Sequence, residues 1–346
     1  MSFTQKQRDN IKSYLLNQID KKNKDYVHKT VEAYEISKAT VYSYLKKMVE
    51  EGIIKKTENG FPYELISHAA NFVYKPSDGL EEDIIFHRDI KGVLPDLPRN
   101  VMDIWRYSFT EMMNNAIEHS QAPLIACRVV TDKLNTKIII GDNGIGIFNN
   151  IQKYFKDVLG QEITLNDAVA ELFAGKLTTA SSNHSGEGIF FTSRAVDYFF
   201  ILSGNKVFSH TSYDDYIDEL KENLVSDEGT WVLMKLSNTS PKNLQDIMFG
   251  YSDVDRGFYK TALPIVNMFE HGDPVSRSEA RRLGAVIKRF EEVSLDFKNV
   301  EAVGQAFVHE LFVVFKRNNP EIELKVENAN TAVSNMIQRV LNSNNS

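Results

Sequence analysis

The chain has 346 residues, of which 42% are hydrophobic and 25% charged, and its formal net charge is −7. This length exceeds what one ordinary core accommodates, and the composition excludes a disordered polymer, so we expect two or three folded domains. The apolar runs are far shorter than the roughly 20 residues of a membrane-spanning helix, and residues 6–12 lack the apolar stretch of a secretory signal, so we expect a cytoplasmic protein without a membrane segment.

The cysteine content restricts the kinds of covalent and metal site that the chain can have, and the charge distribution indicates which part can approach phosphates. Cys127 is the single cysteine, which excludes an internal disulfide and a multi-cysteine zinc cluster. Residues 1–60 hold 12 Lys and Arg against 8 Asp and Glu, a balance of +4, whereas the rest holds 28 against 39, a balance of −11. This split suits a small module that approaches phosphates, attached to a body that does not.

Residues 1–66 have the pattern of a winged helix-turn-helix. Apolar spacing predicts helices over 6–21 and 26–33, and a third that begins after Ser37 as N-cap and stops at Gly52. Residues 53–56 and 61–66 resemble two short strands, joined by a turn that contains Asn-Gly. Three helices followed by a hairpin indicate a winged helix.

A winged helix places its third helix in the major groove of DNA and its hairpin near phosphates. The residues available for this are Lys38, Thr40, Tyr42, Ser43 and Lys46 on the third helix, and Lys55 and Lys56 on the wing. Winged helices also serve in protein docking or dimerisation, and the charge is modest for a DNA binder. The lysines alone also fit a solvated helix face.

Residues 67–84 are irregular, and we expect a linker there, with the first strand of the next domain starting near its end. The following domain, 85–240, is expected to be a mixed sheet with helices on one side. Its predicted elements are a helix over 98–119 and strands over 124–130, 136–141, 198–202, 206–210 and 229–236. The polar interlude 148–185 contains one candidate helix, 165–173, and favours a mobile lid over a core element.

The first motif of this domain, TEMMNNAIEHS, lies on the predicted helix 98–119. Glu111 and Asn115 are four residues apart, so their side chains leave the same helix face. Asn115 offers a hard oxygen to Mg²⁺, which takes its other ligands from water and phosphates, and Glu111 can accept a proton from an attacking hydroxyl.

Two glycine-rich motifs follow, GDNGIGI and NHSGEGIFF. Asp142 ends a strand and can accept a hydrogen bond from the exocyclic amine of adenine, and Gly144 and Gly146 let the backbone pass beside the base. In the second motif the backbone amides at a helix N-terminus would face the phosphates; its residues are Ser185, Gly186, Glu187 and Gly188. Lys176, shortly before, can reach phosphates when the lid closes, although it also fits a solvated loop. Either glycine motif alone is compatible with an ordinary turn.

Together the three motifs resemble the GHKL superfamily, which includes sensor histidine kinases, gyrase-type ATPases and anti-sigma-factor serine kinases. The resemblance covers about 85–238 and implies the Bergerat α/β sandwich, with ATP and Mg²⁺ as ligands. It implies Glu111 as general base, Asn115 as metal ligand and Asp142 as the adenine-binding carboxylate. Thr230, after Gly229, matches a threonine that supports the adenine contact. His184 stands where many kinases have a glycine, which puts lid flexibility in doubt.

After an expected linker at 241–274, residues 275–346 are predicted to form a small αβ domain. Ser276 and Glu279 make a capping box, and a strand over 293–297 and a helix over 302–315 follow. The segments SRSEARRLG and LDFKNVEAVGQAF resemble a STAS-like domain, related to anti-sigma-factor antagonists. These antagonists carry a phosphorylated serine where this chain has VGQAF, without a hydroxyl. The resemblance therefore implies a protein partner or a sensing role here, not a phosphorelay.

The sequence thus predicts an α+β multidomain protein: a winged helix, a GHKL domain and a STAS-like domain. Its expected function is ATP- and Mg²⁺-dependent control of DNA binding with slow ATPase activity, and a homodimer is possible. The alternative is a protein serine kinase of the anti-sigma-factor type that acts on a separate partner. A sensor histidine kinase is disfavoured, because no paired long helices with a phosphoacceptor histidine precede residue 98. An adaptor with a relic site is disfavoured because Glu111, Asn115 and Asp142 are all present.

Overall fold

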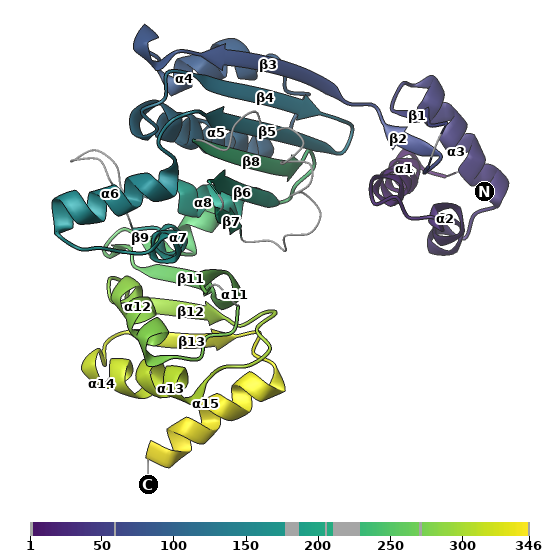
Figure 1. Ribbon diagram of the computed structural model, residues 1–346. Helices are drawn as coiled ribbons and strands as arrows, with labels where there is room; N and C mark the ends of the chain where they lie inside the picture. Colours follow the sequence, from purple (N-terminus) through teal and green to yellow (C-terminus); the bar gives the residue numbers. More distant parts are fainter. Residues whose placement is uncertain are drawn as a thin grey trace.

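The computed structural model describes residues 3–58, 60–176, 187–204, 206–209, 229–269 and 272–344. Figure 1 shows a helical unit at the N-terminal end of strand β3, a central sheet with helices, and a smaller C-terminal sheet with its own helices. Among the described residues, no helix is both long and apolar enough to cross a bilayer. One apolar core runs through the central and C-terminal parts, whereas the N-terminal unit has a separate core.

The N-terminal unit contains three helices and a hairpin, in the order expected from the sequence. Its elements are α1 (Gln5–Asp20), α2 (Tyr26–Tyr34), α3 (Lys38–Glu50), β1 (Ile54–Lys56) and β2 (Tyr63–Leu65). Ser37 Oγ accepts the backbone N–H of Thr40 at 3.1 Å, so the predicted N-cap of α3 is present. Val41, Leu45 and Met48 are buried on the inner face of this helix, which leaves the opposite face to solvent.

The central sheet has six strands in the order β3-β4-β5-β8-β6-β7. The strands are β3 (His68–Tyr74), β4 (Ile125–Thr131), β5 (Asn135–Asp142), β6 (Tyr198–Ser203), β7 (Lys206–Ser209) and β8 (Thr230–Ser237). Every neighbouring pair is antiparallel, so the expectation of a mixed sheet is wrong. The stretch 67–84 also differs from the expected linker, because β3 pairs with β4 along its whole length.

Helix α5 (Arg99–His119) lies against this sheet and supplies much of its core. Its buried face consists of Val101, Ile104, Trp105, Ser108, Phe109, Met112, Met113 and Ala116. The other helices of the central part are α4 (Glu82–Ile85), α6 (Ile147–Leu159) and α8 (Gly188–Ala195), and η1 (Pro76–Asp78) and the π-helical segment η2 (Phe86–Ile90) precede α5. The three- to four-residue spacing of large apolar side chains on α5 is what the sequence predicted.

Helix α7 (Leu165–Ala174) is a core element, which corrects the expectation of a mobile lid for this part of the 148–185 interlude. A capping box at Thr164 starts the helix, and all seven residues from Ala168 to Ala174 are buried. Helix α7 is buried because it packs between the central part and the C-terminal sheet. Thr261 Oγ1 of that sheet donates to the carbonyl of Ala174 at 3.1 Å.

The C-terminal part is a three-stranded parallel sheet with helices. Its strands are β11 (Lys260–Pro264), β12 (Glu292–Asp296) and β13 (Glu323–Glu327), in that order. Its helical segments are α11 (Ile265–Met268), α12 (Arg277–Ile287), α13 (Gln305–Val308), η3 (His309–Phe315), α14 (Lys316–Asn318) and α15 (Thr331–Asn344). Ser276 and Glu279 form the predicted capping box at the start of α12.

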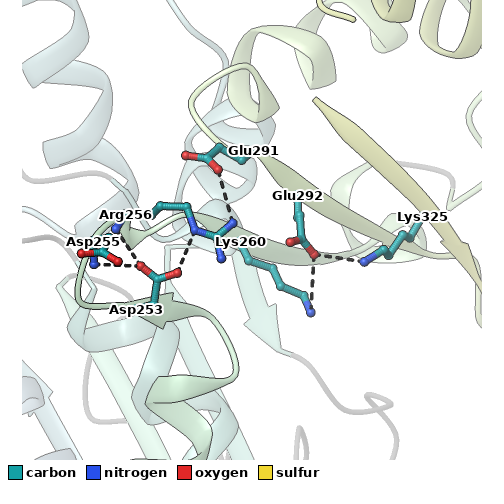
Figure 2. A network of polar contacts seen from close by, with 7 residues as sticks. All are labelled: Asp253, Asp255, Arg256, Lys260, Glu291, Glu292 and Lys325. Carbon is teal, nitrogen blue, oxygen red and sulfur yellow. Dashed lines mark hydrogen bonds and ion pairs between the residues drawn. The ribbon is translucent and has the colours of Figure 1, made fainter. Parts of the chain in front are cut away.

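Residues 241–274 were expected to be a linker, but they contain regular elements, which are α10 (Leu244–Phe249), β9 (Ser252–Asp253), β10 (Gly257–Phe258), β11 and α11. Figure 2 shows how polar contacts tie this stretch to the C-terminal sheet. Arg256 bonds to Asp253 at 2.7 Å and lies 3.5 Å from Glu291, while Glu292 lies between Lys260 at 4.0 Å and Lys325 at 3.0 Å. These ion pairs are only partly buried and individually weak, so the strand pairing of β11 is what includes this stretch in the C-terminal part.

The buried position of α7 gives a first prediction. Phe173 is fully buried and stacks on Phe208 with ring centroids 4.2 Å apart, so Phe173→Ala should lower the free energy of unfolding by about 3–5 kcal/mol. Urea unfolding followed by circular dichroism measures this change. Leu159→Ala, at a side chain 46% exposed, is the control and should stay within about 0.5 kcal/mol of the parent. Equal effects of the two substitutions would mean that α7 is not part of the core.

Candidate functional site

Helix α5 carries the first motif, and its exposed edge positions two of the candidate residues. Glu111 and Asn115 are both partly buried, while Met112, Met113 and Ala116 beside them face the sheet. One helical turn separates Glu111 from Asn115, so they lie on the same side of α5. The helix is held by its apolar face, which leaves these two polar side chains at its margin.

The glycine at the start of α8 lies directly against Glu111. A Cβ atom added to Gly188 would come within 2.0 Å of Glu111 Oε2, so a side chain at this position would displace the carboxylate of Glu111. Glu187, the N-cap residue of α8, lies close enough to Tyr107 for its charge to act on that side chain. Burial, followed by the charges of Glu111 and Glu187, raises the pKa of Tyr107. The second glycine motif therefore reaches α5 at Glu111.

The first glycine motif reaches the same helix at its C-terminal end. The backbone N–H of Ile145 donates to the carbonyl of Ser120 at 2.9 Å, and a Cβ on Gly144 would come within 1.9 Å of that oxygen. Asn150 Nδ2 donates to the carbonyl of His119 at 3.3 Å. The absence of a side chain at Gly144 is thus required by the close approach of the two backbones.

Asp142 is the most buried of the candidate polar residues, with 7% of its surface exposed. It ends β5 directly opposite Thr230 of β8, and Asp142 Oδ1 accepts the backbone N–H of Gly144 at 2.9 Å. Burial raises the pKa of Asp142 to about 6, although hydrogen bonds from Gly144 and Thr230 oppose the shift. A buried carboxylate with capacity for further hydrogen bonds suits a donor such as an amine.

Thr230 connects the loop after Asp142 to strand β8. Thr230 Oγ1 accepts the backbone N–H of Ile147 at 2.9 Å, so the threonine fixes the start of α6. The preceding Gly229 has a φ of +86° and lies so close to Asp142 that a Cβ would come within 2.0 Å of its carbonyl oxygen. Gly146 also has a positive φ, +81°, and forms the N-cap position of α6.

These contacts bring most of the candidate residues around one helix. Asn115 follows Glu111 by four residues and precedes Ser120 by five, so it lies on α5 between the places where the two glycine motifs meet that helix. Ser185 and Gly186 lie outside the described residues, as does His184.

Lys176 contacts the C-terminal part in this structure. Its Nζ donates to the carbonyl of Arg289 at 2.9 Å and lies 4.6 Å from the centre of the Phe290 ring. Burial, and then the charge of Arg289, lowers the pKa of Lys176. The contact of Lys176 with phosphates stays a prediction.

The side chains predicted to contact DNA are mostly exposed. Lys38, Tyr42, Ser43, Lys46, Lys55 and Lys56 all face solvent, and 54% of Tyr42 is exposed. Thr40 is less available, because its hydroxyl lies 2.9 Å from Ser37 Oγ in the N-cap of α3. Lys55 forms an ion pair with Glu64 across the hairpin at 2.6 Å.

Sequence reasoning missed several residues that build this site. Ser120 was part of the first motif, but only the structure identifies its carbonyl as the partner of the glycine loop. Ser203 Oγ donates to the carbonyl of Gly229 at 2.8 Å, and no local pattern indicated this contact between β6 and the start of β8. Tyr107 lies one helical turn before Glu111, and this spacing in the sequence could have indicated that Tyr107 is part of the site.

Comparison with known proteins identifies one segment. Residues 279–334 match the family described as a STAS-like domain of unknown function (DUF4325). The matched segment covers α12 to the first part of α15, so the C-terminal part contains a STAS-like domain. No curated protein matches the chain.

The raised pKa of Asp142 predicts a stability effect with a defined sign. In the folded protein the neutral carboxyl is favoured, so its stabilising contribution is complete below about pH 3.8 and is lost as the pH rises through about 6. Asp142→Asn removes this cost and should stabilise the ligand-free fold at pH 8 by up to about 3 kcal/mol.

Thermal unfolding of both proteins between pH 4 and pH 8 measures this effect, and the difference should shrink as the pH falls through about 6. Asp157→Asn, at an exposed position of α6, provides the matched control and should show no such trend. A variant less stable than the parent at pH 8 would contradict the assigned role of burial.

Proposed function

We propose that this chain is an ATP- and Mg²⁺-binding regulatory protein of the GHKL type, in which the nucleotide controls DNA binding by an N-terminal winged helix. The observation that carries the proposal is the gathering of three motifs around α5, with Gly188 against Glu111 and Gly144 against the end of the helix. Two glycine-rich turns without a common function would not be expected to contact the same helix on both sides of Asn115.

Each residue has a role in this proposal. Asp142 accepts a hydrogen bond from the amine of adenine, and Asn115 offers its amide oxygen to Mg²⁺. Among the described residues, no three His, Cys, Asp or Glu side chains gather into a metal-binding group. The proposed ion therefore takes most of its ligands from phosphate and water, as is usual for Mg²⁺. Glu111 orients and deprotonates the attacking water, which allows slow hydrolysis.

A path from the nucleotide site to the N-terminal unit supports the regulatory role. Strand β8 begins with Thr230 beside Asp142 and carries Lys235 five residues later. Lys235 Nζ lies 3.8 Å from Asp20 of α1, and Leu134 packs against the core of the N-terminal unit. Burial, with a smaller contribution from Asp20, raises the pKa of Asp132 at this contact. The N-terminal unit therefore rests on the strand that holds Thr230.

The C-terminal part, which contains the STAS-like segment, contacts the other side of the site. Arg194 of α8 donates to the carbonyl of Ala262 in β11 at 2.8 Å. Arg282 of α12 lies 3.1 Å from Asp167 of α7, and Arg289 pairs with the buried Glu171. A partner that binds the STAS-like domain would thus act on α7 and α8, the helices on either side of the second glycine motif.

A groove beside α5 favours a second candidate function, a protein serine kinase. It has a volume of about 1060 Å³ and is lined by α5 residues that include Tyr107 and Thr110, and by Asn243 to Gln245 at the start of α10. Tyr107 lies one helical turn before Glu111 on the same side of α5, so a polypeptide in this groove would approach the side of the helix that carries the proposed base. Incubation with labelled ATP and a cell extract distinguishes the two functions, because a kinase yields a labelled second protein.

Two substitutions separate nucleotide binding from hydrolysis. Asp142→Asn should abolish binding of Mg-ATP in a calorimetric titration, because the carboxylate that accepts the adenine amine is lost. Glu111→Ala should retain binding and lower the rate of phosphate release by about 10²-fold or more. Asp157→Ala, a carboxylate exposed on α6, should change neither. Normal hydrolysis by the Glu111 variant would exclude its role as base.

The link between ATP and DNA is tested at Lys235. Fluorescence anisotropy with a mixed-sequence duplex should give a different affinity with and without Mg-ATP for the parent chain. Lys235→Met should retain ATP binding but reduce this difference severalfold, because the contact between β8 and α1 is lost. Lys137→Met, on the neighbouring strand β5, is the control substitution and should leave this difference in DNA affinity unchanged. Identical DNA affinity of the parent chain with and without Mg-ATP would exclude the regulatory function.

A further inference from the structure

Strand β3 forms one edge of the central sheet. It pairs with β4 over all seven of its residues, and within the described part of the chain no strand pairs with its other side. Figure 1 shows β3 along the outer margin of the sheet, where it continues toward the N-terminal unit. An edge of this kind offers a row of backbone N–H and C=O groups to a further strand.

This edge lacks the usual protection against pairing. The sequence of β3, HAANFVY, contains no Asp, Glu, Lys, Arg or Pro, which are the residues that commonly block edges. The end strand β13 of the C-terminal sheet differs, because its sequence ELKVE places charges at three of five positions. Val73 on β3 is 68% exposed, so the edge is open and partly apolar.

A groove borders the same strand. It has a volume of about 540 Å³, and its lining combines apolar residues such as Phe72, Val73 and Ile84 with the charged residues Lys75, Glu81, Arg88 and Asp89. Ile84 is itself 50% exposed. An added strand would therefore find both free backbone groups and apolar surface beside them.

We propose that two copies of this chain associate through antiparallel pairing of their β3 strands, which joins the two sheets into one. The strand is self-complementary when the pairing is centred on Asn71. Ala70 then faces Phe72 of the second copy, and Ala69 faces Val73, so Phe72 and Val73 each meet a small side chain. His68 faces Tyr74 at the two ends of the pairing. Because β3 carries no charged residue, no like charges on the two strands oppose each other.

This pairing fixes the positions of two N-terminal units. Two residues separate the end of β2 from the start of β3, so each unit would follow its strand closely. The dimer axis would relate the two units by twofold symmetry, the arrangement with which helix-turn-helix dimers bind two half-sites. The association itself does not depend on the nucleotide site.

The paired surface is small, because one strand and a groove bury less than a stable interface usually does. We therefore expect a concentration-dependent equilibrium between the 39.5 kDa chain and a species of twice that mass. Sedimentation equilibrium of the full chain without nucleotide measures it. A single species with the mass of one chain at every concentration overturns the proposal.

Charge exchange at Asn71 tests the partner and the register together. Asn71 is exposed and faces Arg128 of β4, so Asn71→Lys should destabilise each chain, and Asn71→Asp stabilise it, by no more than about 1 kcal/mol. Asn71→Lys and Asn71→Asp should each weaken dimerisation at least tenfold, because each places like charges opposite each other. A mixture of the two variants should restore the dimer. Asn318→Lys, the same change at an exposed site on α14, should have no effect. Unchanged dimerisation of both Asn71 variants overturns the proposal.

Cysteine crosslinking measures the register directly. The native Cys127 is buried and should not react. Asn71→Cys should oxidise to a covalent dimer, since directly opposed Cβ atoms lie about 5 Å apart. Ala69→Cys alone should not, because its two copies would lie about 13 Å apart along the strands, whereas a mixture with Val73→Cys should. Crosslinking of Ala69→Cys alone, as efficient as that of Asn71→Cys, contradicts this register.

Discussion

The close approach of two glycine loops to helix α5 is the constraint on which the candidate site depends. At Gly144 there is no room for a side chain, because a Cβ would come within 1.9 Å of the Ser120 carbonyl oxygen, and at Gly188 a Cβ would displace the carboxylate of Glu111. The helix can hold this position because its opposite face is buried in the sheet. The positions of the polar residues therefore depend on the apolar packing of α5 against the sheet and on the contacts between α5 and the two glycine loops.

The site is also mechanically connected to both neighbouring parts. Strand β8 joins the Asp142–Thr230 pair to the contact between Lys235 and Asp20. Helices α7 and α8 bond to strand β11 of the C-terminal part through Ala174 and Arg194. The central and C-terminal parts also share one apolar core, so the two parts are packed against each other.

Local signals in the sequence predicted most of the helices and strands. The N-caps at Ser37 and Ser276, the helix that carries Glu111, and the strand that ends at Asp142 are all present as expected. These features depend on a few neighbouring residues, which explains why the sequence sufficed. The proposed functions of Glu111, Asn115 and Asp142 stay predictions, because nothing in the structure tests ligand binding.

The features that sequence reasoning missed depend on contacts between distant residues. Helix α7 looked like part of a polar interlude, yet the C-terminal sheet buries it, and β11 looked like linker because its pairing partner β12 lies about thirty residues later. The insertion of β8 between β5 and β6 was likewise invisible locally. Lys176 was assigned from its neighbours in sequence, whereas its contacts come from Arg289 and Phe290.

The guanidinium of Arg194 lies 3.4 Å from the centre of the Phe190 ring and 5.1 Å from that of Tyr251. Burial lowers the pKa of Arg194 to about 10, yet the group remains a cation at neutral pH and must keep its acceptors in an apolar environment. Sliding α8 past β11 would remove the carbonyl of Ala262 from the acceptors of this cation and leave it only partners on its own side of the joint. The contact between the two parts therefore resists shear at Arg194.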